Sequence, residues 1–136
     1  MREIKKEKEL LKPIANYLKD KGYARQMVEA CFFDYAIDLY GYSEKKRRCV
    51  AIELKLYDWK KALKQALVYQ LCADYVYVAF PESSLTRVQI SAFSEFGIGF
   101  IAVSPDRCRQ VLKAKKSIEL MSHYKSEMIR MTKWGD

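Results

Sequence analysis

Residues 50–57 carry two opposite charges on one face of an otherwise apolar strand. They read Val-Ala-Ile-Glu-Leu-Lys-Leu-Tyr, and because side chains alternate along a strand, Glu53 and Lys55 point the same way. A run this apolar is typical of a strand that is buried on both faces, where a charge is costly unless it is paired or binds a metal. The segment therefore predicts either a metal site or a buried ion pair.

Other polar residues lie where they could face this pair. Glu7 belongs to the apolar face of a predicted first helix, and Asp38 lies in the strand that precedes the turn before residues 50–57. Gln65 and Tyr69 are four residues apart on the next predicted helix, so they share one side of it. Along the chain, the acidic residue of the first helix comes first, then the aspartate, then the Glu53–Lys55 pair, and last the Gln and Tyr of the next helix.

This ordered set resembles the PD-(D/E)xK nuclease superfamily, which includes many restriction enzymes, archaeal-type Holliday junction resolvases and nuclease domains of recombination exonucleases. That family has an acidic residue in its first helix, an aspartate on one strand and (D/E)-x-K on the next; Glu7, Asp38 and residues 53–55 match. A Gln-x-x-x-Tyr motif on the following helix, here residues 65–69, is typical of its exonuclease-like branch. The sequence departs from the signature at Ile37, where the family has proline.

The resemblance implies a DNA nuclease that hydrolyses phosphodiester bonds through a metal-activated water. Asp38 and Glu53 would supply carboxylate oxygens to Mg²⁺ or Mn²⁺, with the backbone carbonyl of Leu54 as a further ligand. Lys55 would orient the attacking water or offset charge in the transition state.

The two helices would complete that site. Glu7 would bind a second ion or fix a metal-bound water. Gln65 would position Lys55 or a phosphate, and Tyr69 would buttress this arrangement from one turn further on. The competing interpretation of Glu53 and Lys55 is a structural ion pair.

Two assignments have alternatives. Asp34 would face the same side of a regular strand as Asp38, and would replace it if a bulge shifted the register. Glu3 and Glu9 are the alternatives to Glu7, although Glu9 points off the apolar face of the helix.

Hydrophobic spacing and turn residues predict the elements that hold these residues. We expect a helix over 3–21, which Pro13 either kinks or shortens, and one strand over 27–42, or two with a bend near 33–34. A strand over 49–56, a helix over 58–72, a strand over 73–80, a helix over 83–96 and a strand over 98–103 follow. The basic segment from Pro105 to about 132 is expected to be mostly helical.

These elements predict a single α/β domain over 1–136 with a mixed central sheet flanked by helices. The resemblance implies that residues 3–104 form a restriction-endonuclease-like αβββαβ core. Residues 105–136 would add an extra C-terminal helix. With little chain beyond that core, we expect structure-selective or partner-directed cleavage.

The chain has 136 residues and a net charge of +8, which favours phosphate-bearing partners. One basic cluster lies in the hairpin turn, which we expect beside the site, and another follows Pro105. We expect both to hold DNA backbone phosphates without reading bases. Their residues are Lys45, Lys46, Arg47 and Arg48, then Arg107, Arg109 and Lys113.

Several classes are disfavoured. No apolar stretch approaches the roughly 20 residues that span a membrane, and the first residues lack the apolar core of a signal peptide, so we expect a cytoplasmic protein without a membrane partner. Cys31, Cys49, Cys72 and Cys108 are scattered, which disfavours a zinc site and favours buried reduced thiols.

Two other functions compete with cleavage. A non-cleaving nucleic-acid-binding module on the same fold would explain the charge, because one fold can host different functions. A regulatory subunit would explain the Met-rich amphipathic stretch 118–131, which would pack on the core or form a homodimer contact.

Overall fold

The computed structural model describes residues 3–134. Its helices and strands are η1 (Glu7–Leu10, 3-10), α1 (Leu11–Asp20), β1 (Arg25–Phe32), β2 (Tyr35–Ser43), β3 (Arg48–Leu54), α2 (Trp59–Tyr69), β4 (Tyr75–Pro81), η2 (Glu82–Arg87, 3-10), α3 (Ile90–Glu95), β5 (Gly99–Ser104), β6 (Arg107–Leu112), α4 (Ser122–Met131) and β7 (Lys133–Trp134).

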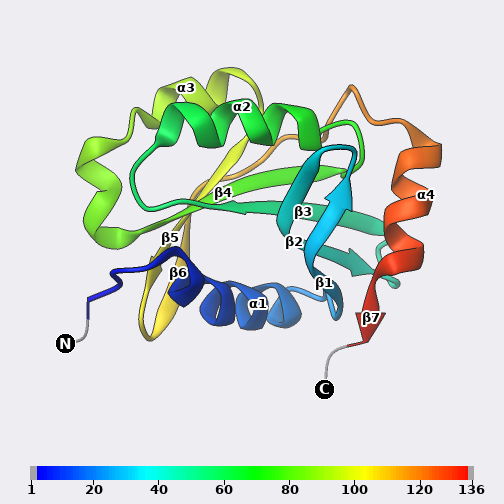
Figure 1. Ribbon diagram of the computed structural model, residues 1–136, viewed down its shortest axis with the longest axis horizontal. Helices are drawn as coiled ribbons and strands as arrows, with labels where there is room; N and C mark the ends of the chain where they lie inside the picture. Colours follow the sequence, from blue (N-terminus) through cyan, green and yellow to red (C-terminus); the bar gives the residue numbers. More distant parts are fainter. Residues whose placement is uncertain (1–2, 135–136) are drawn as a thin grey trace.

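Within the described residues the strands form one seven-stranded sheet in the order β6-β5-β4-β3-β2-β1-β7. β3, β4 and β5 are parallel to one another, and the other neighbours are antiparallel. Both parallel pairs are joined through helical connections, as parallel strands require. α2 and α3 cover one face of the sheet, α1 covers the other, and α4 lies at one end (Figure 1). The predicted α/β architecture with a mixed, helix-flanked sheet is confirmed.

β3 crosses the middle of the molecule and is buried on both faces after its first residue. Ile52 and Leu54 pack in a core under α1, whereas Ala51 packs in a second core under α2. Glu53 lies between Ile52 and Leu54 and faces α2, where Tyr69 contacts it. The predicted alternation along this strand is therefore confirmed.

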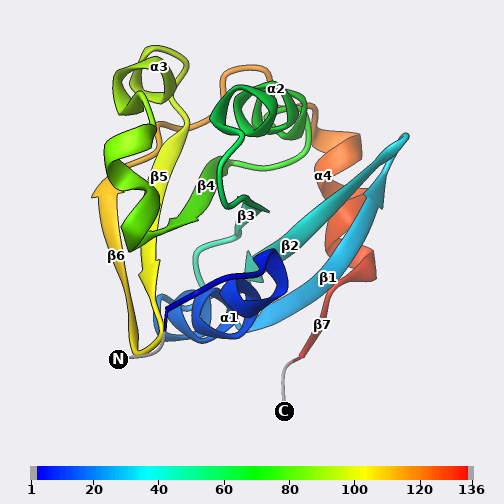
Figure 2. The same cartoon turned by 60° about the vertical axis from the view of Figure 1, so that its left-hand side comes forward.

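Residues 25–43 form two strands, so the second of the two predicted alternatives, with a bend at Phe33 and Asp34, is the observed one. The two strands pair from Arg25↔Tyr42 to Phe32↔Tyr35 in one continuous register. Phe33, with φ of 54°, forms the tight turn between them. The hairpin projects from the sheet as an arm (Figure 2).

Pro13 shortens the first helix, which is one of the two alternatives that the sequence predicts. α1 starts at Leu11, so Pro13 lies in its first turn, where a missing N–H costs little. Gly22 ends the helix with φ of 99°. The shorter of the two predicted helices is therefore the observed one.

Two predictions for the second half of the chain are wrong. The helix expected over 83–96 is divided into η2 and the short α3, because Val88 adopts an extended conformation and is buried between them. The segment after Pro105 begins as strand β6 rather than helix. It turns back through Asp106 and pairs with the open edge of β5, and α4 starts only at Ser122.

In the described part of the chain, no helix combines the length and apolarity needed to cross a membrane. All four cysteines are free thiols. Cys49 and Cys72 are buried, but Cys31 is exposed because it lies on the outer face of the β1–β2 arm, so the prediction of buried thiols is wrong there.

Candidate functional site

The predicted aspartate and glutamate meet where the β2–β3 ladder ends. The last paired residues are Leu39 and Ile52, so Asp38 and Glu53 are the next positions on the two strands. Instead of continuing the ladder, Asp38 accepts a hydrogen bond through Oδ2 from the Leu54 N–H at 2.8 Å. This bond fixes the Asp38 carboxylate against β3, beside Glu53.

Glu53 is held by a partner on α2 and faces the predicted lysine. Its side chain is only 3% exposed. The Tyr69 hydroxyl donates a hydrogen bond to Glu53 Oε1 at 2.7 Å, and Lys55 Nζ lies 3.7 Å from Oε2. One oxygen is therefore committed to Tyr69, while the other faces a cation at a distance longer than an ordinary hydrogen bond.

Burial makes both carboxyl groups harder to ionise. Burial, followed by the charge of Asp38, raises the pKa of Glu53 to about 7, against the hydrogen bond from Tyr69 and the charge of Lys55, which lower it. Burial also raises the pKa of Asp38, against the Leu54 N–H that lowers it. The charge of Asp38 adds to the shift of Glu53, whereas a side-chain hydrogen bond with Glu53 lowers the pKa of Asp38. Carboxyl groups with raised pKa values are concentrated at functional sites.

The loop after β3 is fixed by two further hydrogen bonds. The Lys55 N–H donates to the Ala79 carbonyl at 3.1 Å, and the Ser84 hydroxyl donates to the Leu56 carbonyl at 2.7 Å. These bonds fix the backbone at Lys55, just after the end of β3. The Lys55 side chain is 14% exposed. A ligand at this end of the sheet can reach it.

Glu7 lies on η1 near the two carboxyl groups. After burial and the Leu54 hydrogen bond, its charge is the next influence on the pKa of Asp38, which it raises. Within residues 3–134, however, no three Asp, Glu, His or Cys side chains lie close enough together to hold a metal ion. The role of Glu7 as a ligand stays a prediction.

The structure distinguishes Asp38 from its alternative. Asp34 is exposed in the turn of the β1–β2 arm. The arm keeps one register from Val28↔Leu39 to Ala30↔Ile37, so no bulge shifts Asp34 toward β3. Among these two aspartates, Asp38 is the one placed beside Glu53.

Glu9, one alternative to Glu7, has a structural role. Its Oε1 accepts hydrogen bonds from the N–H groups of Lys5 at 3.1 Å and Lys6 at 2.9 Å, as a residue of a helix N-terminus does. Glu3 lines a separate hollow between α1 and the β5–β6 turn.

Gln65 presents a buried acceptor without a donor. Its side chain is half-buried, and its Oε1 accepts no hydrogen bond from the described residues. Tyr69, one helical turn on, forms the bond to Glu53 described above. A buried carbonyl oxygen left without a donor is costly, which makes this atom a candidate contact for a ligand, a water or a cation.

Glu29, beside the site, has an unusual backbone conformation that the sequence does not predict. Glu29 stands opposite Asp38 in the β1–β2 register, yet that pair is missing from the ladder because Glu29 has φ of 51°. Glutamate rarely adopts this left-handed conformation, and such backbone strain is concentrated at functional sites.

The first basic cluster is not beside the carboxylates, so that prediction is wrong. Residues 45–47 lie in the turn before β3 and Arg48 is the first residue of β3, whereas Glu53 is near its end. Five residues of strand separate Arg48 from Glu53 by about 16 Å. The basic turn and Glu53 are close in sequence but lie at opposite ends of β3.

The second basic cluster is divided between two ends of the sheet. Arg107 and Arg109 lie on edge strand β6, near the same end as Glu53 but separated from β3 by two strands. Arg109 forms an ion pair with Glu82 of η2. Lys113 follows the other end of β6.

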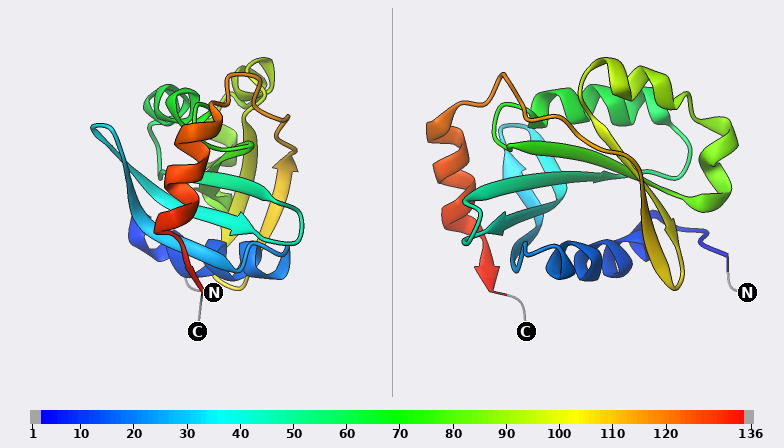
Figure 3. Two further views of the ribbon diagram at one scale, coloured as in Figure 1. Left: turned by 90° about the vertical axis from the view of Figure 1, so that its right-hand side faces the viewer. Right: turned by 180° about the vertical axis from the view of Figure 1, so that it is seen from behind.

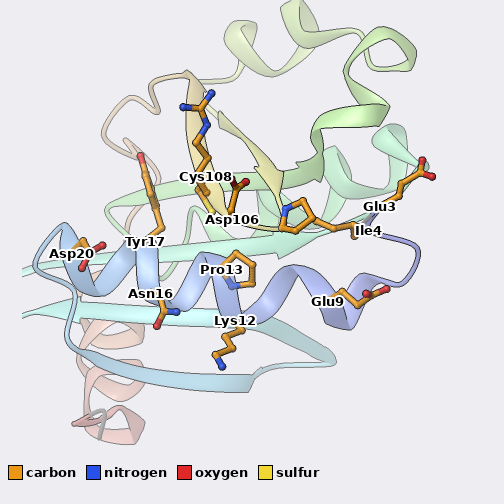
Figure 4. A pocket seen from close by; sticks show the side chains of 12 residues that line it. Glu3, Ile4, Glu9, Lys12, Pro13, Asn16, Tyr17, Asp20, Asp106 and Cys108 are labelled. Carbon is orange, nitrogen blue, oxygen red and sulfur yellow. The ribbon is translucent and has the colours of Figure 1, made fainter. Parts of the chain in front are cut away.

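A hollow of about 660 Å³ lies between α1 and the β5–β6 turn, and neither Asp38, Glu53 nor Lys55 lines it. Pro13, Asn16 and Tyr17 line one side and Asp106 the other (Figure 4). Its acidic and basic side chains are mixed, so it has no clear preference for the charge of a ligand.

No protein-family model and no curated protein matches this chain. Among solved structures, the SPO1766 protein of unknown function from Silicibacter pomeroyi is similar, with a TM-score of 0.74 at 16% sequence identity. The match covers 93% of this chain and 83% of that one. At this identity the likeness concerns the fold alone.

Proposed function

We propose that the chain is a divalent-metal-dependent DNA nuclease of the PD-(D/E)xK type, built on a restriction-endonuclease-like core. The observation that carries the proposal is the meeting of Asp38 and Glu53 at the opening of the β2–β3 ladder, with Lys55 beside them. The order α1-β1-β2-β3-α2-β4 agrees with the αβββαβ core of that family.

The residues at this point fit a divalent cation. Buried Glu53 and half-buried Asp38 have raised pKa values and lack a full countercharge, and Gln65 Oε1 on α2 lacks a donor. Asp38 and Glu53 would hold Mg²⁺ or Mn²⁺ through hard oxygen atoms, together with the carbonyl of Leu54. When bound, the ion would lower the pKa of a water and neutralise phosphate charge.

The chain's own groups have distinct tasks in this proposal. Tyr69 is a positioning residue, because it holds Glu53 Oε1 and leaves Oε2 directed to Lys55. Lys55, partly exposed, would orient the water or stabilise negative charge on the phosphate. The Leu54 N–H keeps Asp38 in place.

The structural ion pair explains this geometry less well. A pair retained for stability is expected to form hydrogen bonds at about 2.7–3.2 Å, whereas Lys55 Nζ and Glu53 Oε2 are 3.7 Å apart. The net effect of the surroundings also raises the pKa of Glu53, so Lys55 does not compensate for burial.

The test is cleavage of labelled duplex, branched and single-stranded DNA by the purified chain, with Mg²⁺ or Mn²⁺ and with a chelator. We expect metal-dependent cleavage that falls by about 10²–10⁴-fold in Glu53→Gln and Lys55→Ala. Asp34→Asn, an exposed carboxylate on the same arm, is the matched control and should retain activity. Absence of cleavage from all three substrates would refute the proposal, and full activity of Lys55→Ala would refute the site assignment.

A non-cleaving nucleic-acid-binding module is the second candidate. It is favoured by the net charge of +8 and by the finding that the described residues contain no three-ligand group. Metal-independent binding that weakens with salt and leaves the strand intact would support this candidate.

A further inference from the structure

A hollow of about 490 Å³ lies on the α1 face of the sheet, between the C-terminal end of α1 and strands β3 to β6. Figure 3 shows α1 and the β5–β6 hairpin, two of its walls, side by side. Four of the described residues that line it are basic and none is acidic. They are Lys21, Lys46, Arg48 and Lys113. We call this hollow the basic groove.

The positive charge of the basic groove is not neutralised within the protein. In residues 3–134, no ion pair joins any of its four basic side chains to a carboxylate. Nearby acids are engaged elsewhere: Glu44 pairs with Arg25, and Asp74 pairs with Lys125. Four cations around one hollow repel each other, and an anion bound between them would remove that repulsion.

Tyrosine rings hold three of these cations in place. Each of the three lies over the face of a groove tyrosine, which limits the freedom of a long side chain before any ligand binds. The pairs are Lys21–Tyr17, Lys46–Tyr23 and Arg48–Tyr75, with 5.3, 5.8 and 5.7 Å from the cation to the ring centroid, respectively.

A fourth tyrosine has a fixed position in the wall. Tyr77 packs against Gly99, where an added Cβ would lie 2.3 Å from the Tyr77 ring. The Tyr77 hydroxyl donates a hydrogen bond to Gln110 Oε1 at 2.8 Å. Aromatic rings interleaved with cations are typical of surfaces that bind single-stranded nucleic acid.

The basic groove is separate from the carboxylate pair. Arg48 is about 16 Å along β3 from Glu53. Val50, which lines the groove, packs in the core under α1, whereas Glu53 faces α2. The two sites therefore lie at opposite ends of β3 and on opposite faces of the sheet.

The volume of the basic groove limits which form of nucleic acid can enter it. About 490 Å³ is within the range of small-ligand sites, 300–1,000 Å³. A double helix, whose major groove alone is about 12 Å wide, does not enter such a space. The backbone of one strand does.

We propose that the basic groove binds the phosphodiester backbone of a single nucleic-acid strand, as a contact distinct from the carboxylate pair. This binding requires neither a metal ion nor cleavage, so it holds whether or not the proposed nuclease activity is present.

The test measures binding of a fluorescein-labelled mixed-sequence 12-nucleotide DNA strand by anisotropy, in a chelator, over a range of salt concentrations. The groove variant Lys21→Gln/Lys46→Gln/Arg48→Gln/Lys113→Gln should bind at least tenfold more weakly. Losing four phosphate contacts should lower the slope of log K against log salt by about 3, at about 0.7 per contact. The matched control Lys60→Gln/Lys61→Gln/Lys64→Gln/Lys116→Gln removes four exposed charges outside the groove and should keep most of the slope.

Further variants and competing ligands distinguish groove binding from the alternative explanations. Lys113→Glu, an exposed change outside any strand, repeats the test with little risk to folding and should weaken binding several-fold. Glu53→Gln should bind as the unchanged protein does, which separates this proposal from nuclease activity. Equal losses in the groove and control variants would overturn the proposal, as would displacement of the strand by an equal concentration of a nucleoside triphosphate. Groove-dependent binding of the matching duplex at the same affinity would also overturn it.

Discussion

Replacing Glu53 by glutamine should stabilise the protein at high pH and not at low pH. Glutamine keeps the shape of the side chain and an oxygen that accepts from the Tyr69 hydroxyl, so the change removes chiefly a charge. Burial raises the pKa of Glu53 from 4.5 to about 7 in the folded state. Above pH 7 the folded protein therefore holds an ionised carboxylate in a position that favours the neutral form.

The size of the effect follows from proton linkage. Between pH 4.5 and 7 the folded state binds more protons at this group than the unfolded state does, so stability falls as pH rises. A shift from 4.5 to about 7 corresponds to about 3 kcal/mol, at about 1.4 kcal/mol for each pKa unit. Glu53→Gln should regain about this free energy at pH 8 and little of it at pH 4.5.

Urea denaturation of both proteins at pH 4.5 and pH 8, in a chelator, measures the difference. Asp34→Asn is the control, because this exposed carboxylate should leave stability nearly unchanged at both values. Mg²⁺ at pH 8 should stabilise the unchanged protein more than Glu53→Gln, because a cation relieves the same cost. If Glu53→Gln instead destabilises the protein more at pH 8 than at pH 4.5, the Glu53 charge is stabilised by Lys55, and the structural ion pair is the correct interpretation.

Two further changes test the geometry around Glu53, and a third tests the wall of the basic groove. Tyr69→Phe removes a hydrogen bond that lowers the pKa of Glu53, so that pKa should rise, and stability at pH 8 should fall by about 1–3 kcal/mol in urea denaturation. Asp38→Asn removes a neighbouring charge, so the pKa of Glu53 should fall, and a carboxyl NMR titration that shows no change would contradict the proximity of the two acids. Gly99→Ala places a Cβ 2.3 Å from the Tyr77 ring and should destabilise by about 1–3 kcal/mol or more, with the midpoint of thermal unfolding lowered accordingly.

The central part of the site could be predicted because it depends on local patterns. The alternation of Glu53 and Lys55 follows from the two-residue period of a strand. The proximity of Asp38 follows from a short hairpin connection, which makes the next strand antiparallel. Gln65 and Tyr69 share a side because their spacing is one helical turn.

The parts that could not be predicted depend on contacts between distant segments. β6 forms because β5 offers an open edge, and a basic segment such as Arg107–Leu112 has no local pattern that specifies pairing. The sequence predicts the basic turn beside Glu53 because the hairpin links them, yet a strand extends about 3.3 Å per residue and separates the two. The positive φ of Glu29 cannot be predicted from the sequence, because glutamate has no preference for that conformation.

The electrostatics of the carboxylate pair argue that it is retained for a reason other than stability. The charge of Asp38 raises the cost of ionising Glu53, and Lys55, with Nζ 3.7 Å from Glu53 Oε2, does not cancel the cost of burial. An apolar side chain at position 53 would fill the same buried space under α2 without this penalty. Keeping both acids at the end of an otherwise apolar strand lowers the free energy of unfolding by a few kcal/mol near neutral pH. A cation bound between the two acids would lower that cost, and the unpartnered Gln65 Oε1 gives a further polar atom on the same face. Stability, pH and metal binding are therefore linked through one side chain, Glu53.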